Sequence, residues 1–186
     1  MHKKRFIQIA ALAAAGVLAQ GAFAADGTIN FTGDIVDAPC SISANSQNLS
    51  VPLGKVTRTV FDGATAGTAT LGKHSLNPAK FTIDLLGCGA TAKGATVTFS
   101  GTADADDATY LRITNAGQVG VTAASGVAIE IGDSAGTKIA LGSASGQYTL
   151  GLGDNSLKFQ ASYVATKTAV TTGPANATAQ FTVAYK

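Results

Sequence analysis

The chain has 186 residues, of which 13% are charged and 6% are aromatic, and its formal net charge is +2 at pH 7. No basic patch interleaved with aromatic residues appears, so the charge pattern typical of nucleic-acid-binding proteins is missing. The length is typical of a single domain.

The first 24 residues have the pattern of a secretory signal peptide. Basic residues 3–5 precede an apolar run over residues 6–18, and Ala22-Phe23-Ala24 fits a signal peptidase site. The alternative is an N-terminal membrane anchor, but the run is shorter than the roughly 20 residues that span a bilayer. Cleavage would leave residues 25–186, with ten basic and eleven acidic residues. We therefore expect an exported protein without membrane insertion.

The segment that follows, "INFTGDIVDAPC" (Ile29–Cys40), begins with the pattern of a strand. Ile29, Phe31 and Ile35 are apolar and are separated by polar residues, as in a strand with one buried face. No tight turn follows that would bring a hairpin partner alongside. The sequence therefore predicts a strand that has no obvious partner in its own chain.

Two cysteines, Cys40 and Cys88, are present. In an exported protein an even number of cysteines favours a disulfide. This one would close a loop of about 49 residues, which is worth about 4 kcal/mol in the chain-entropy model. The alternatives are free thiols or half of a metal site, but only His74 remains after cleavage to complete such a site. We expect the disulfide and neither a metal nor another cofactor.

The later periodic segments also alternate apolar and polar residues, as strands do. They are Lys80–Cys88, Ala95–Gly101, Gly126–Gly142, Ser156–Thr166 and Ala177–Lys186. The third is predicted to be a hairpin, because Gly-Asp-Ser-Ala-Gly separates apolar residues 127, 129 and 131 from apolar residues 139 and 141. The pattern assigns no element to Ala66–Ser75 and predicts no long helix.

Several short strands with frequent turn residues predict an all-β fold, an immunoglobulin-like β-sandwich. With few aromatic residues, its core is expected to consist mainly of Val, Ile, Leu and Ala. The last predicted strand directs Phe181, Val183 and Tyr185 toward the core, and the chain stops at Lys186. A sandwich of this type normally has one more strand, so we expect an incomplete sandwich with an uncovered apolar edge.

The unpaired segment near the N-terminus could complete such a sandwich in a neighbouring molecule. Insertion of Ile29–Ile35 into the open edge of the next subunit is strand addition. A head-to-tail contact of this type does not close on itself, so it builds a filament.

Four stretches carry a family resemblance. They are "FTGDIVDAPCSI" (Phe31–Ile42), "FTIDLLGC" (Phe81–Cys88), "ASYVAT" (Ala161–Thr166) and "GPANATAQFTVAYK" (Gly173–Lys186). The last has a penultimate tyrosine, Tyr185, and a glycine fourteenth from the end, Gly173. Together they resemble the major subunit of chaperone–usher fimbriae of the type 1 or P-pilus kind.

The resemblance implies a role for each end of the chain. Ile29, Phe31, Gly33 and Ile35 would be the donor-strand residues that enter successive pockets of a neighbouring subunit. Gly33 matches a glycine that such strands carry where the groove leaves no room for a side chain. The alternative for Gly33 is a bulge or a close backbone approach within its own sheet.

The resemblance also implies a C-terminal strand that a periplasmic chaperone holds, which would include Gly173, Phe181, Val183, Tyr185 and Lys186. It implies three regions, a signal peptide (1–24), a donor-strand extension (25–38) and a pilin domain (39–186). The expected partners are identical or related pilin subunits, a chaperone, an outer-membrane usher, and tip adhesin or adaptor subunits. The expected location is a fimbria on a bacterial cell surface, where it supports adhesion.

Nothing in the sequence indicates an enzyme. His74 and Ser75 are adjacent in a polar stretch, which does not make a catalytic triad. Asp104, Asp106 and Asp107 lack the glycine and distal glutamate of an EF-hand loop, and "GLGDNS" (151–156) is predicted to be a turn. Two other functions stay open, a minor adaptor or terminator pilin and a secreted monomeric lectin-like sandwich.

Overall fold

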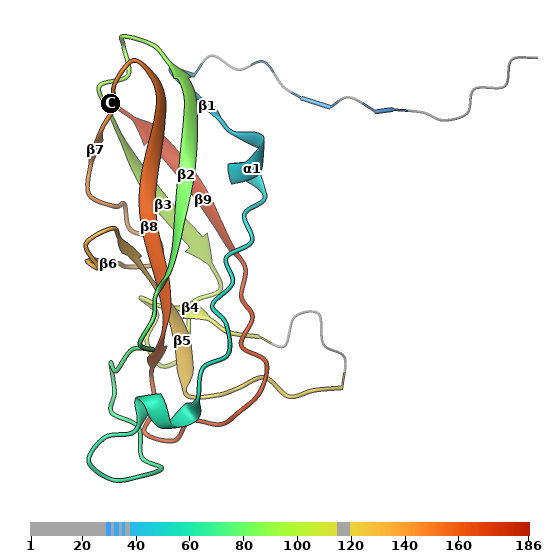
Figure 1. Cartoon of the computed structure of the whole chain (residues 1–186), viewed down its shortest axis with the longest axis vertical. Helices are drawn as coiled ribbons and strands as arrows, with labels where there is room; N and C mark the ends of the chain where they lie inside the picture. Colours follow the sequence, from blue (N-terminus) through green and yellow to red (C-terminus); the bar gives the residue numbers. More distant parts are fainter. Residues whose placement is uncertain (1–28, 31, 34, 36–37, 115–119) are drawn as a thin grey trace, which may run out of the picture. The chain divides into compact units, whose positions relative to one another are not determined.

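The computed structural model describes residues 29–30, 32–33, 35, 38–114 and 120–186. The predicted signal peptide and Phe31 lie outside the described residues. The chain divides into two units, Met1–Val36 and Asp37–Lys186, and each is described by itself. The second unit contains all the described strands and helices (Figure 1).

Two antiparallel sheets make up this second unit. In the larger sheet, strands β1 (Ser41–Ile42), β2 (Ala79–Cys88), β8 (Gly153–Ala165), β5 (Val127–Asp133) and β4 (Leu111–Arg112) lie in that order, and β6 (Lys138–Ile139) also pairs with β5. The smaller sheet has the order β7 (Tyr148–Thr149), β3 (Gly94–Gly101), β9 (Ala179–Tyr185). Two short helices, α1 (Ala44–Gln47) and the 3-10 helix η1 (Arg58–Phe61), lie between β1 and β2 in the chain.

The predicted strands are confirmed with small shifts of their ends. The hairpin of β5 and β6 forms, with Ile131 opposite Ile139, but Leu141 leaves it and donates its backbone N–H to Thr109. The predicted turn over residues 151–156 is half wrong, because β8 begins at Gly153. The Asn155 side chain bonds both the N–H and the carbonyl of Gly151, and this holds the turn just before the strand.

The buried core of the described residues consists mainly of Val, Ile, Leu and Ala, as expected, and a small group of aromatic rings joins the two sheets. The Phe159 ring of β8 lies 5.1 Å from Phe99 of β3, 5.6 Å from Phe81 of β2 and 5.4 Å from Tyr148. Edge-to-face and offset pairs at these distances add to the free energy of burial. Alternation alone did not show that these rings meet, because they come from four different strands.

The segment Ala66–Ser75, to which the sequence assigns no element, runs beside the end of β8. Gly72 donates to the carbonyl of Ala165, and Ser75 donates to that of Tyr163. In addition, the backbone N–H of Tyr163 donates to the Ser75 hydroxyl. β2 supplies hydrogen-bond partners to the first part of β8, and residues 72–75 supply them to its last residues.

Candidate functional site: an edge strand and an apolar groove

Strand β9 lies at the edge of the smaller sheet. It pairs with β3 in antiparallel register, with Phe181 opposite Phe99 and Val183 opposite Val97. Within the described ranges, no strand pairs with its other side. The prediction of an uncovered edge at the last strand therefore agrees with the sheet topology.

The backbone N–H and C=O groups of successive β9 residues point alternately toward β3 and toward the open side of the sheet. Lys186 exchanges two hydrogen bonds with Gly94, at 2.8 Å and 3.0 Å. In an antiparallel ladder every second residue forms such a pair. The pairs continue at Ala184, Thr182 and Gln180, so the N–H and C=O groups of Phe181, Val183 and Tyr185 point away from β3. These groups can bond an additional strand.

The inward side chains of β9 are less buried than those of its neighbour. Along β3, Ala95, Val97 and Phe99 are buried, whereas Phe181 and Val183 of β9 are only partly buried. The prediction that these β9 residues face the core is right about direction. Their partial exposure indicates that the core is not closed on this side.

An apolar groove of about 1,220 Å³ lies beside β9. One wall consists of residues 175–182, and the opposite wall consists of Ser46–Gly54. The floor includes Phe81, Ile83, Phe99, Leu111, Ile129, Ile131, Ala161 and Tyr163. In Figure 1 the segment after α1 runs alongside the segment that leads into β9. The groove therefore opens between segments from the two ends of the domain, and its apolar floor is largely buried, with Phe81 and Tyr163 partly exposed.

The wall opposite β9 is also without a backbone partner. Within the described part of the chain, residues 49–56 make no backbone–backbone hydrogen bond, and they form neither helix nor strand. Pro52 has no N–H to donate. This wall was missed at the sequence level, because it lacks the alternation that marks a strand.

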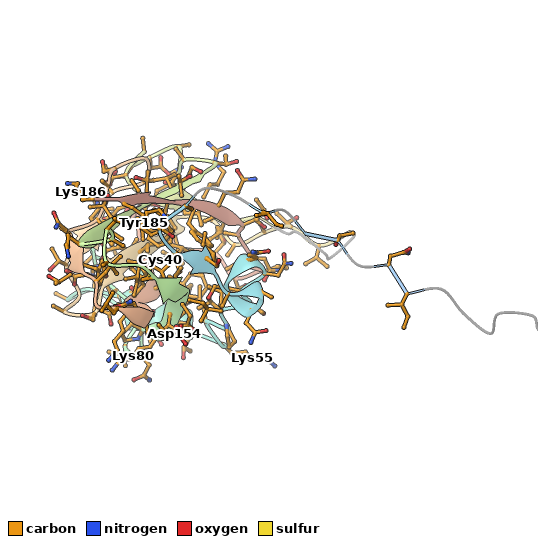
Figure 2. The ribbon with its side chains drawn as sticks, turned by 90° about the horizontal axis from the view of Figure 1, so that it is seen from above. Cys40, Lys55, Lys80, Asp154, Tyr185 and Lys186 are labelled. Carbon is orange, nitrogen blue, oxygen red and sulfur yellow. A yellow bond between two sulfur atoms is a disulfide. The ribbon has the colours of Figure 1, made fainter. Side chains whose placement is uncertain are left out.

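The disulfide and Tyr185 lie together beyond the end of this groove. Cys40 and Cys88 form the predicted disulfide, with their Cα atoms 4.2 Å apart. The Tyr185 hydroxyl donates to the Cys40 carbonyl over 3.3 Å, and the two residues lie side by side in Figure 2. Burial raises the pKa of Tyr185 above its ordinary value. The bridge thus ties the start of the domain to β2, and the tyrosine ties it to β9.

The residues predicted for the C-terminal strand differ in whether they lie in β9 and whether they line the groove. Phe181 lines the groove, whereas Val183 and Tyr185 do not. Lys186 continues the pairing with Gly94 beyond β9. The prediction that Gly173 belongs to this strand is wrong, because β9 begins at Ala179. A Cβ at Gly173 would lie 2.5 Å from the Thr122 carbonyl oxygen, so a close backbone approach explains the glycine.

The predicted donor residues belong to the first unit. Ile29 and Ile35 are exposed, at 78% and 105% of their reference areas. The described residues of this segment are not in a strand. A Cβ built at Gly33 meets no atom within 4 Å, so the alternative of a close approach within its own sheet finds no support in the described residues.

His74 lies outside the named strands and its side chain is exposed, as expected for a loop residue in a polar stretch, but it also has a partner. Its Nε2 lies 3.0 Å from Oε2 of Glu130, which is largely buried. Both residues line a polar pocket of about 210 Å³ with Ser75, Gln160 and Ser162. The pairing could not be predicted, because His74 and Glu130 are far apart in sequence.

The acidic stretch forms a loop, as predicted. Asp104 accepts backbone N–H bonds from Asp106 and Asp107, and Asp106 pairs with Lys167 at 3.3 Å. Hydrogen bonds from Thr109 lower the pKa of Asp107. Among the described residues there is no group of three or more His, Cys, Asp or Glu side chains suited to a metal ion. None of the helices in the described ranges has the length and apolar character needed to span a bilayer.

Comparisons with known proteins identify the class of protein that this fold and groove define. A family model described as fimbrial protein matches residues 29–186. Long polar fimbria protein A of Salmonella typhimurium is 42% identical over 95% of this chain and 94% of its own. The probable major fimbrial subunit LpfA of Escherichia coli O157:H7 is 41% identical over 99% of this chain and 97% of its own.

A solved structure gives the same result. The P pilus rod subunit PapA is 25% identical, with a TM-score of 0.62 over 80% of this chain and 100% of its own. The chain belongs to the fimbrial protein family, and it is a structural subunit of a bacterial surface fimbria. Its fold is the predicted immunoglobulin-like sandwich of chaperone–usher pilins.

Proposed function

We propose that this subunit polymerises head to tail by donor-strand exchange. The groove beside β9 accepts the segment Ile29–Ile35 of the next subunit, with Ile29, Phe31, Gly33 and Ile35 directed into it. The observation that carries the proposal is the open edge of β9, whose outward backbone groups border an apolar groove. The exposed Ile29 and Ile35 supply the apolar face that such a groove requires.

The interaction energy of such a contact is of the same size as the entropic cost of association, so contacts beside the three apolar side chains set the net stability. Burial of each large apolar side chain contributes about 1.5–3 kcal/mol. Each backbone hydrogen bond along the open edge contributes about 0.5–1.5 kcal/mol net. Three side chains and several hydrogen bonds together reach about 10 kcal/mol, which is comparable to the entropic cost of association. Burial of Gly33 and of the flanking backbone adds to this energy and sets the lifetime of the contact between two subunits.

The same groove explains the need for delivery partners. An exposed apolar edge aggregates unless something covers it. We infer that residues 1–24 direct export and that a periplasmic chaperone covers the groove, contacting Phe181, Val183, Tyr185 and Lys186. An outer-membrane usher then exchanges the chaperone strand for the segment of the next subunit. Residues 25–38 act as the donor extension and residues 39–186 as the pilin domain.

Other subunits would share this mode of joining. Tip adhesin or adaptor subunits are the expected neighbours at one end of the filament, and adhesion of the cell is the expected result of assembly. The chain covers nearly the whole of a relative named as a probable major subunit, which favours the shaft over a minor position. Mass spectrometry of sheared fimbriae tests this, since a shaft subunit must be the most abundant protein.

The test of polymerisation is a substitution that spares the domain. Gly33→Ile places a large side chain where the donor strand has none, so filaments should be lost while the soluble subunit persists in the periplasm. The measurement is the ladder of SDS-resistant oligomers in surface-sheared material, with Asn30→Gln as a control in the same segment. Normal ladders from Gly33→Ile would count against the proposed donor strand.

A further inference from the structure

Ser46 stands out because it is a buried polar residue in the wall of the groove. It is 1% exposed, and it lies in α1, which is a single helical turn. Its hydroxyl accepts a hydrogen bond from the backbone N–H of Asp84 at 2.9 Å and one from the Ser43 hydroxyl at 2.9 Å. It therefore connects the groove wall to β2.

The bond between Ser46 and Asp84 forms at the point where the hydrogen-bond ladder of β1 and β2 ends. Ser41 and Ile42 pair with Leu86 and Leu85, and Ser43 donates its N–H to the carbonyl of Asp84. A continued antiparallel ladder would return a bond from the Asp84 N–H to the Ser43 carbonyl. That carbonyl instead accepts from the N–H groups of Ser46 and Gln47, because it begins α1.

The Ser46 hydroxyl thus takes the place of a backbone carbonyl. It satisfies the Asp84 N–H at the point where the chain leaves the sheet, and an unsatisfied buried N–H would be costly. Directly after α1, the chain becomes the groove wall at residues 48–54. Residues 49–54 make no backbone–backbone hydrogen bond within the described ranges, and Leu53 packs against the core, so the hydrogen-bonded anchor that precedes them helps to set their position.

We propose that Ser46 is a positioning residue for strand acceptance. It fixes the place where the chain departs from β2, and it thereby sets the separation between the wall at residues 48–54 and β9. The inference rests on the proposed function, because it concerns the same groove. It adds a specific residue that decides how tightly an inserted strand is held.

The chain offers a matched control in Ser145, a second buried serine. Its hydroxyl accepts from the backbone N–H of Val97 at 3.0 Å, so it satisfies a strand N–H as Ser46 does. Ser145 does not line the groove. Substitution of either serine by alanine removes the same kind of hydrogen bond, but only one of the two lies in the wall.

The experiment uses the oxidised chain that begins at Ala25, refolded with an excess of fluorescently labelled peptide of residues 25–38. Dissociation of the peptide is then followed after addition of unlabelled peptide. We expect about tenfold faster dissociation from Ser46→Ala, as follows from one orphaned N–H, and a change within about twofold from Ser145→Ala. Ser43→Ala, which keeps the acceptor for Asp84, should give a smaller acceleration and replaces Ser46→Ala if that variant does not fold.

The outcomes separate this inference from the function on which it rests. Equal dissociation rates for Ser46→Ala and Ser145→Ala would overturn the positioning role while strand acceptance stands. If Ser46→Ala does not fold, an unchanged rate for Ser43→Ala would overturn it in the same way. A chain of the original sequence that binds no peptide would overturn the proposed function, and the role of Ser46 with it.

Discussion

Two positions of this subunit, 33 and 173, hold glycine for different physical reasons. Gly173 is packed so closely that a Cβ would lie 2.5–2.8 Å from backbone atoms of Thr122, Ala123 and Ala124. Gly33 has open space around it within its own chain. The first glycine is therefore explained by packing within the domain, whereas contacts of the described residues do not explain the second.

Replacement of Gly173 should destabilise the domain itself. Gly173→Ala forces a methyl group against backbone that cannot rotate away, so we expect a loss of about 1–3 kcal/mol in the free energy of unfolding. Urea unfolding of the oxidised chain measures it. Gly146→Ala is the control, since a Cβ there meets nothing within 4 Å. Equal midpoints for the two variants would contradict the packing role.

The partly buried tyrosines predict a loss of stability at alkaline pH. Burial raises the pKa of Tyr163 and of Tyr185 above the ordinary value of 10.0. The unfolded chain then releases these protons first as the pH rises, so stability is complete below pH 10 and declines as the pH passes toward the raised values. Unfolding midpoints at pH 8 to 11 measure the decline.

Tyr163 offers the specific check of that prediction. Its hydroxyl donates to the carbonyl of Ala175 over 2.9 Å. Tyr163→Phe should lower stability at pH 8, because that bond is lost, and should make the decline above pH 10 shallower, because one ionising group is removed. The same slope in both proteins would show that Tyr163 does not contribute.

At the scale of elements, the disulfide and β9 organise the groove. The Cys40–Cys88 bridge fixes β1 against the end of β2, and Tyr185 connects Cys40 to β9. One end of the domain is thereby held together by a covalent bond and a hydrogen bond. The groove opens where these connections end.

Removal of the bridge should cost much of the stability of the subunit. Cys40→Ser combined with Cys88→Ser opens a loop of about 49 residues, which the chain-entropy model values at about 4 kcal/mol. Denaturant unfolding of the variant, compared with the oxidised chain before and after reduction, measures this loss. A double variant as stable as the oxidised chain would show that the bridge is dispensable.

The strands and the open edge could be predicted because alternation is a local signal. Lys80–Cys88 and Ala95–Gly101 are each predicted to within about one residue, and Phe181 lies at the groove as expected. The wall at residues 48–54 could not be predicted, because its backbone lacks both strand pairing and alternation. The replacement of the Ser43 carbonyl by the Ser46 hydroxyl depends on contacts across 38 residues, which no local pattern contains.

At the scale of the whole molecule, the proposed function gives each subunit two separable activities, acceptance of a strand and donation of one. Phe31→Asp should abolish donation, because a carboxylate cannot be buried in the apolar groove without a large cost. Its own groove stays intact. Expressed together with the original subunit, it should be absent from the filaments, because each incoming subunit joins by donating its segment to the one before it.

Mass spectrometry of fimbriae sheared from the co-expressing cells measures this effect. Thr32→Asp is the control, since it adds the same charge on the polar face of the same segment. Incorporation of Phe31→Asp at the level of the original subunit would contradict the role of Phe31 in donation. Equal exclusion of both variants would indicate that charge alone, rather than the buried face, is responsible.

The position of the cysteine bridge has a mechanical consequence for a filament joined in this way. Tension on the donor segment reaches the domain at Cys40, two residues before the end of β1. The ladder of β1 is too short to bear a steady pull. The sulfur–sulfur bond instead carries the load directly into β2 and, through its long pairing with β8, into the rest of the larger sheet. A pulled fimbria would therefore yield first at the joints between subunits and not within them.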